Sequence, residues 1–185
     1  ELRNRLAALE YKAGLITSDL MADPVALQSL VELTPLAKNF FNVSVLVVDR
    51  NGISLADTPY APERIGIDYR ERVDAFAIAL DEGRATVGSP LVGLSTGQPL
   101  IPLAVPIRDD AGQVIGALGG AIDLSTPNFF DELTATGYGQ TGHYSIVARS
   151  DRLVVTSSNK DLIMAELPDP GVNLVLDRAI LDAGV

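Results

Sequence analysis

The sequence predicts an α+β domain in which a mostly antiparallel sheet carries helices on one face, followed by a shorter second part. Three observations predict this fold class: an apolar seam at helical spacing in the first twenty residues, a short hairpin after Phe40, and a longer hairpin over residues 101–124. Apolar residues make up 47% of the 185 residues, so the chain can bury a hydrophobic core.

The first segment predicts a long helix. Its apolar residues alternate at spacings of four and three, as in a helix that packs along another element: Leu2, Leu6, Leu9, Ala13, Ile16 and Leu20. Burial against the chain's own domain and a seam between two chains of a homodimer both explain this spacing. Asp23-Pro24 then predicts the start of a second, short helix with Leu27, Leu30 and Val31 on its apolar side.

From Phe40 the apolar period changes to two, which predicts strands. Val43, Val45 and Val47 form the first strand, residues 49–52 form a turn, and Ile53 begins the second strand. Asn51-Gly52 is a strong hairpin signal because both residues tolerate positive φ. Residues 57–66 carry two prolines and a glycine and are expected to form a loop, in which Asp57 caps a turn. The range 69–80 is expected to form a helix that ends near Gly83.

Two long strands follow, over residues 101–106 and 114–124, with a turn at residues 109–112. Gly116, Gly119 and Gly120 leave space above the second strand, which suits either a bound molecule or a large neighbouring side chain. After a helical link at Phe129-Phe130, a further hairpin is expected over residues 144–156, and a last helix over 174–181. This C-terminal part has too few strands for a second full sheet.

Composition excludes several classes of function. The net charge of -10 argues against nucleic acid and anionic membrane surfaces as partners. Without cysteine, and with His143 as the one histidine, the chain is expected to hold no metal and no cofactor. No apolar run reaches about 18 residues, so we expect any membrane contact through segments outside this chain.

A catalytic role is not expected either. Residues 93–97 match the G-x-S-x-G pattern of hydrolases, but that motif requires a following helix, and Pro99 and Pro102 stand in a strand-like stretch. The Asp-rich segments 49–52 and 109–112 lack the alternating oxygen ligands of a calcium loop and are better explained as hairpin turns. We therefore expect no catalytic residue.

Several ordered pieces carry a resemblance to a known family. They are VLVVDRNG (45–52), GIDYRER (66–72), TGQP (96–99), AVPI (104–107), GQVIG (112–116) and IDL (122–124). Together they resemble the membrane-distal module of a double Cache sensor domain, and GQTG (139–142) followed by Tyr144 resembles the entry to the membrane-proximal module.

The resemblance implies an N-terminal helical segment (1–39), a membrane-distal Cache module with a PAS-like sheet (40–126), and a linker with a partial membrane-proximal module (127–185). It also implies a place on the periplasmic or extracellular face of the bacterial inner membrane. There it would precede the output domain of a histidine kinase, chemoreceptor or cyclic-di-GMP enzyme.

Eight residues are expected to contact a small ligand: Arg72, Arg70, Asp123, Tyr69, Tyr60, Phe76, Thr96 and Gln98. Arg70 and Arg72 are expected to open the helix that borders the pocket, where a guanidinium can pair with a carboxylate. Asp123 matches a position that grips a ligand amine in the family. Amino-acid-binding members carry an aromatic pair after the arginine at position 72, whereas Val73, Asp74 and Ala75 follow here, which argues against an ordinary α-amino acid.

The predicted function is therefore an extracytoplasmic sensing domain that binds a carboxylate- or amine-bearing metabolite in the distal module and relays a conformational change. The alternative is a ligand-free module for dimerisation or protein interaction, with the pocket filled by its own side chains. The two differ in whether Arg72→Ala abolishes ligand binding while the fold stays intact.

Overall fold

The computed structural model describes residues 1–33, 40–94, 96–134, 144–149 and 151–182. They form two compact units, Glu1–Thr126 (unit 1) and Pro127–Val185 (unit 2). The leading helices belong to the same unit as the first sheet. Each unit is described by itself below.

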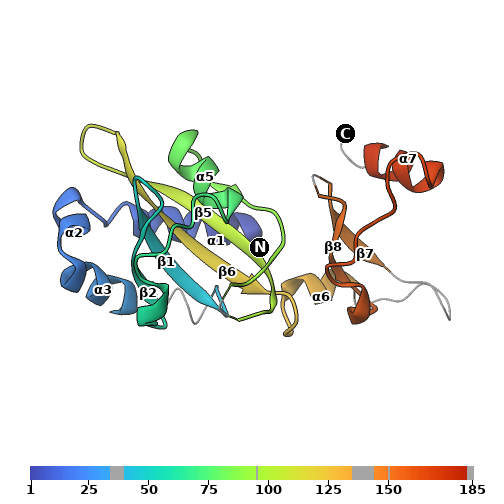
Figure 1. Ribbon diagram of the computed structural model, residues 1–185, viewed down its shortest axis with the longest axis horizontal. Coiled ribbons are helices and arrows are strands. Elements are labelled where there is room, and N and C mark those ends of the chain that lie inside the picture. The colour runs from blue at the N-terminus through green and yellow to red at the C-terminus, as the bar shows by residue number, and fades with distance from the viewer. Residues whose placement is uncertain (34–39, 95, 135–143, 150, 183–185) are drawn as a thin grey trace. The chain divides into compact units, whose positions relative to one another are not determined.

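Unit 1 is built on one antiparallel sheet of six strands (Figure 1). Its strands are β1 (Ser44–Asp49), β2 (Ser54–Thr58), β3 (Thr86–Val87), β4 (Leu91–Val92), β5 (Pro99–Arg108) and β6 (Val114–Asp123). The order across the sheet is β2-β1-β6-β5-β3, and β4 also pairs with β5. The two predicted hairpins are thus confirmed as β1–β2 and β5–β6, and they join along the β1–β6 ladder.

The two hairpin turns share one chemistry. Asp49 Oδ1 accepts hydrogen bonds from the amides of Asn51 and Ile53, both at 2.8 Å, and Asp109 does the same in the β5–β6 turn. Gly52 adopts a φ of 91°, but Asn51 does not have the positive φ that the Asn-Gly signal predicted. The aspartate cap instead favours a longer turn in which one glycine takes the left-handed position.

The N-terminal helix is shorter than the apolar seam predicted. α1 covers Leu2–Ala13, Gly14 follows it, and a separate short helix α2 covers Ser18–Ala22, capped by the Thr17 hydroxyl. The predicted second helix is present as α3 (Pro24–Leu33), and Asp23 caps it by accepting from the amides of Val25 and Ala26.

Helices cover both faces of the sheet in unit 1, so the prediction that they lie on one face is wrong. Leu46 and Val48 of β1 pack with α5 (Asp74–Asp81), whereas the intervening Val47 is buried on the opposite face. Figure 1 shows α5 in front of the sheet and α1 behind it, and α1 packs against β5 and β6. The period-two pattern could not show that β1 is buried on both sides, because the four central residues of that strand are all apolar.

A buried lysine links α1 to α3. Lys12 is 1% exposed, and its ammonium donates to the carbonyl oxygens of Leu30 at 2.6 Å and Val31 at 3.5 Å. These carbonyls belong to the last turn of α3, where a cation interacts favourably with the helix dipole. Burial lowers the pKa of Lys12 from 10.5 to about 8. No carboxylate forms an ion pair with Lys12 in the described part of the chain.

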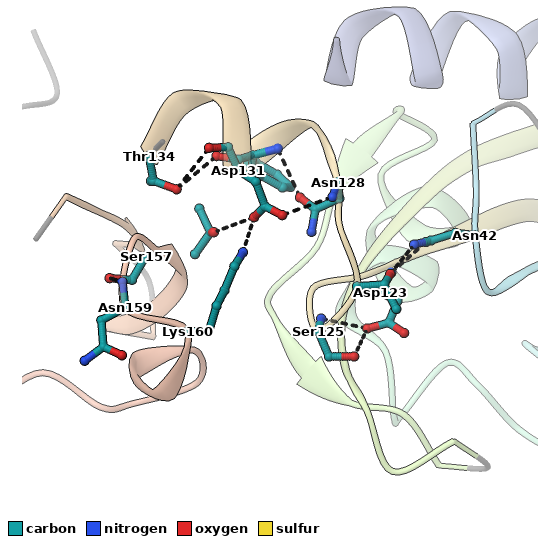
Figure 2. Close-up of polar contacts among 12 residues, drawn as sticks. Asn42, Asp123, Ser125, Asn128, Asp131, Thr134, Ser157, Asn159 and Lys160 are labelled. Atoms are coloured by element: carbon teal, nitrogen blue, oxygen red, sulfur yellow. Dashed lines mark hydrogen bonds and ion pairs between the residues drawn. The ribbon is translucent and has the colours of Figure 1, made fainter. Parts of the chain in front are cut away.

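Unit 2 contains α6 (Phe129–Thr134), β7 (Ser145–Ala148), β8 (Leu153–Ser157), the 3-10 turn η2 (Lys160–Leu162) and α7 (Leu174–Asp182). The link helix, hairpin and last helix predicted for this part are all present. Asn128 caps α6, since its side chain accepts from the Phe130 amide while Asp131 accepts from the Asn128 amide. Asp131 also pairs with Lys160 beside η2 (Figure 2).

The hydrogen-bond pattern of unit 2 repeats the first half of unit 1. After each hairpin the chain runs through a 3-10 turn and returns to the start of the second strand. Ser54 exchanges backbone bonds with Gly66 and Ile67, and Val154 does so with Met164 and Ala165. Positive φ angles recur at matching positions, at Gly52 and Gly66 in unit 1 and at Arg152 and Met164 in unit 2. Unit 2 therefore repeats the local architecture of the β1–β2 hairpin of unit 1 and of the segment that follows it.

Lys12 is expected to make the stability of the chain depend on pH. Its folded pKa of about 8 lies below the usual 10.5, so the unfolded chain binds more protons between these values. The free energy of unfolding should therefore rise as pH increases through this window, by up to about 3 kcal/mol. Urea unfolding at pH 7.5 and pH 10 measures the rise. Lys12→Met keeps the aliphatic stem and should remove it; parallel pH profiles for the two proteins would contradict the assignment.

Candidate functional site

Unit 1 contains a partly enclosed cavity of about 80 Å³ between the sheet and the segment that leads into α5. One water requires about 10–15 Å³ of such space, so the cavity holds roughly five to eight waters or a metabolite of similar size. Its walls come from β1, β5, β6, the β4–β5 connection and α5. We call it the unit 1 pocket.

The sheet side of the pocket is formed by small residues of β6. Gly119, Gly120 and Ala121 line it. A Cβ atom at Gly119 would collide with the ring of Phe76, and one at Gly120 would collide with the ring of Phe41. Of the two explanations that the glycines allowed, large neighbouring side chains account for the space directly above each of them. Phe76 can therefore approach the sheet closely, and the cavity lies beside its ring.

A buried ion pair forms one end of the pocket. Asp57, at 0% exposure, accepts from Arg64 Nε at 2.6 Å through Oδ2 and from the Ala61 amide at 3.1 Å through Oδ1. The predicted turn cap is thus confirmed, but the partner Arg64 was not foreseen. Arg64 ends the 3-10 turn η1 (Pro62–Arg64), and its backbone carbonyl accepts from the Ser54 hydroxyl. These contacts fix the guanidinium, whose side chain is 12% exposed.

Asp57 is also held through its backbone. Gln28 of α3 donates to the Asp57 carbonyl at 2.6 Å, and its own side-chain oxygen accepts from the Asp57 amide at 3.1 Å. The Gln28 amide thereby pairs with the edge strand β2 as a neighbouring strand would. One residue at the pocket is consequently joined to α3 by two hydrogen bonds.

Aromatic side chains form the opposite side of the pocket. The rings of Tyr69 and Phe76 meet edge to face, with centroids 6.0 Å apart. Burial raises the pKa of the Tyr69 phenol, while the positive charges of Arg64 and Arg72 act in the opposite direction. The phenol is therefore protonated at neutral pH and can donate a hydrogen bond to a ligand.

The structure places three of the eight predicted ligand residues on the pocket: Tyr69, Phe76 and Thr96. The other five, which are Arg70, Arg72, Asp123, Tyr60 and Gln98, do not line it. Tyr60 is 55% exposed. Gln98 is exposed and lies between β4 and β5, where its backbone N–H donates to the Thr96 hydroxyl.

Arg70 and Arg72 do not open a helix, contrary to the prediction. α5 begins at Asp74, and the preceding residues form a turn in which Asp68 accepts from the Arg70 amide at 2.9 Å. This side-chain bond competes with helix formation, as is usual for aspartate. Arg70 pairs with Asp81 at the surface, at 2.7 Å. Arg72 is exposed, although its charge acts on Tyr69.

Asp123 lies at the end of β6, opposite Leu100 of β5 and two residues after Ala121, and it is not itself among the residues that line the pocket. Its Oδ1 accepts from the Ser125 amide at 2.7 Å and from the Ser125 hydroxyl at 2.6 Å, and Asn42 accepts from the Asp123 amide (Figure 2). The carboxylate thus has local partners at a strand end, and its contact with a ligand amine stays a prediction.

The hydrolase-like motif over residues 93–97 lacks the structural context that such an enzyme requires. Ser95 and His143 lie outside the described residues, but the segment after residue 97 forms β5 and not the helix that a hydrolase elbow requires. In the part of the chain with described coordinates, no helix is both long and apolar enough to cross a bilayer.

The geometry of unit 1 agrees with a comparison against protein families. The Cache domain model dCache_1 matches residues 3–181. The chain belongs to the Cache domain family. This assignment confirms the resemblance and the α+β fold class predicted from the sequence. A search of curated proteins finds no match.

Solved structures similar to this Cache domain include three chemoreceptor domains. The ligand-binding domain of Pseudomonas fluorescens CtaA with L-serine shares 26% identity at a TM-score of 0.67, covering 90% of this chain and 68% of the other. The ligand-binding domain of Pseudomonas aeruginosa PctC with GABA shares 24% identity at a TM-score of 0.67, and the match covers 90% of this chain and 72% of the other. The ligand-binding domain of PctB from the same organism, with L-Arg, shares 22% identity at a TM-score of 0.69, and the match covers 89% of this chain and 61% of the other. This Cache domain thus spans about two thirds of the length of these domains.

The buried pair at the pocket should matter far more for stability than the exposed pair of Arg70 and Asp81. Asp57→Asn leaves the Arg64 charge without a counterion and is expected to lower the free energy of unfolding by about 3 kcal/mol. Asp81→Asn, the matched control, is expected to lower it by less than about 1 kcal/mol. Urea unfolding of both variants provides the test, and equal losses would show that the Asp57–Arg64 pair behaves as a surface contact.

Proposed function

We propose that the chain is an extracytoplasmic sensing domain that binds a small metabolite in the unit 1 pocket, as part of a membrane-bound signal transducer. The observation that carries this proposal is the cavity itself, whose largely apolar walls also include the fixed guanidinium of Arg64 and the protonated phenol of Tyr69. Three structurally similar chemoreceptor domains hold L-serine, GABA and L-Arg, which supports a small polar ligand. The Cache family further supports a place on the periplasmic or extracellular face of the inner membrane.

The proposed ligand contacts are the lining residues Tyr69, Phe76 and Thr96, together with Arg64. Arg72 is proposed to act through its charge at Tyr69, and not as a lining residue. The transducer is proposed to be a histidine kinase, a chemoreceptor or a cyclic-di-GMP enzyme.

A polar route supports the proposed relay from the pocket to the leading helix. Arg64 binds Asp57, the Asp57 backbone binds Gln28 of α3, and the last turn of α3 accepts from Lys12 of α1. A ligand that moves Arg64 therefore acts on a connected set of elements. It shifts their equilibrium by the difference in its affinity for the two arrangements.

The alternative function, a ligand-free interaction module, is less well supported. It required the pocket to be filled by its own side chains, whereas a cavity of about 80 Å³ is present. The apolar seam also turns largely inward, since Leu9, Ala13 and Ile16 are buried within unit 1. A homodimer through the N-terminal helix stays a prediction.

Filling the pocket should abolish ligand binding. Ala121 lines the cavity, so Ala121→Leu places a large side chain inside it, whereas Ala111→Leu makes the same change in the exposed β5–β6 turn. A thermal-shift screen against organic acids, amines, amino acids, nucleobases and sugars identifies ligands. At about a hundredfold above Kd, a ligand should raise the midpoint by roughly 5–10 °C.

The increase in the unfolding midpoint that a ligand causes should persist in Ala111→Leu and disappear in Ala121→Leu. A ligand that stabilises Ala121→Leu as much as the native chain binds elsewhere, which would contradict the assignment of the pocket.

A further inference from the structure

The charges of the unit 1 pocket point to one class of ligand. We propose that Arg64 is the residue that selects the ligand, and that the pocket takes a short aliphatic monocarboxylate without an amino group. This inference rests on the proposed function. It comes from the hydrogen bonds already made by Asp57 and Arg64, which are the charged side chains among the described residues that line the cavity.

Arg64 keeps part of its donor capacity for a ligand. Its Nε donates to Asp57 and its Nη2 donates to the Pro59 carbonyl, while Nη1 has no acceptor among the residues that the structure describes. Two N–H bonds of Nη1 and one of Nη2 are therefore available. A carboxylate suits this edge of the guanidinium because it accepts two parallel charge-assisted hydrogen bonds.

The guanidinium is also held in place before any ligand arrives. Asp57 fixes one side of it, and the Ser54 hydroxyl fixes the Arg64 backbone. Binding therefore does not have to order a flexible arginine side chain, which preserves affinity for a small ligand. The protonated phenol of Tyr69 supplies a further donor in the same pocket.

The described residues that line the pocket offer no comparable site for an ammonium group. Asp57 is the one carboxylate among the described lining residues, it is fully buried, and each of its oxygens already accepts a hydrogen bond. Asp123, at the position that the family resemblance links to a ligand amine, does not line the pocket and binds Ser125. An ammonium in this cavity would be desolvated without a paired charge, which is costly.

The walls of the unit 1 pocket determine the size and the apolar character of the rest of the ligand. Apolar side chains surround the cavity, among them Leu46, Val73, Phe76, Leu100 and Leu103. With a volume of about 80 Å³, the cavity matches a carboxylate that carries a short alkyl chain. Butyrate is a suitable probe. Butyramide removes its charge and replaces one acceptor oxygen by an NH2 donor, and 2-aminobutyrate adds an amino group.

Calorimetric titration of the full chain with these three probes and with butylamine tests the inference. Butyrate should bind, and butyramide should bind about tenfold more weakly or worse, because a hydrogen bond to a charged group contributes at least about 1.4 kcal/mol. 2-Aminobutyrate should likewise bind at least about tenfold more weakly than butyrate. Tighter binding of 2-aminobutyrate or of butylamine would overturn the inference and leave the proposed function standing, whereas the absence of any ligand in the broad screen would overturn both.

A paired variant isolates Arg64 without leaving a buried charge. Asp57→Asn combined with Arg64→Gln replaces the ion pair by two neutral amides and is expected to keep cooperative unfolding. This variant should bind butyrate at least about tenfold more weakly than the native chain. Arg84→Gln, which changes an exposed arginine outside the pocket, should bind butyrate as the native chain does. Butyrate affinity in the double variant within about twofold of the native value would overturn the role of Arg64.

Discussion

The buried ion pair of Asp57 and Arg64 is the interaction on which the pocket of this Cache domain depends. A buried pair contributes little net stability compared with apolar side chains, but the loss of one partner is severe. Here the ion pair also positions the loop after β2, because it joins Asp57 near the end of β2 to Arg64 at the end of η1. The same carboxylate caps the turn at Ala61. A single aspartate therefore holds both the turn at Ala61 and the guanidinium of Arg64, the one cation among the described residues that line the pocket.

The polar contacts around this ion pair connect the pocket to α3 and α1, along the route proposed for the signal. α3 reaches the pocket through Gln28, whose side chain makes two hydrogen bonds to the backbone of Asp57 in the edge strand β2. The same helix accepts the buried ammonium of Lys12 at its C-terminal turn. A displacement of Asp57 thus acts on rigid elements through short hydrogen bonds. Apolar packing of Phe76 from α5 against Gly119 fixes the aromatic side of the pocket.

Much of the fold could be predicted because its signals are local. The aspartate and glycine of each hairpin turn specify that turn without help from distant residues. Arg64 escaped prediction because its partner lies seven residues away across a loop, and the sequence spacing of Asp57 and Arg64 matches no motif. The start of α5 was misplaced because Asp68 binds the Arg70 amide and holds the chain in a turn. In unit 2, the positive φ of Arg152 had no sequence signal, because the residue that matches Gly52 of unit 1 is not a glycine there.

The central claim is that ligand occupancy of the unit 1 pocket reaches α1 through Asp57 and α3. Hydrogen–deuterium exchange measured with and without a ligand from the screen tests this claim most directly. The account predicts that the ligand changes exchange in the pocket segments, in α3 and in α1. In Gln28→Leu, which removes both bonds to the Asp57 backbone, it predicts that the change stops at the pocket. A native chain in which the pocket is protected while α3 and α1 exchange as before would contradict the account.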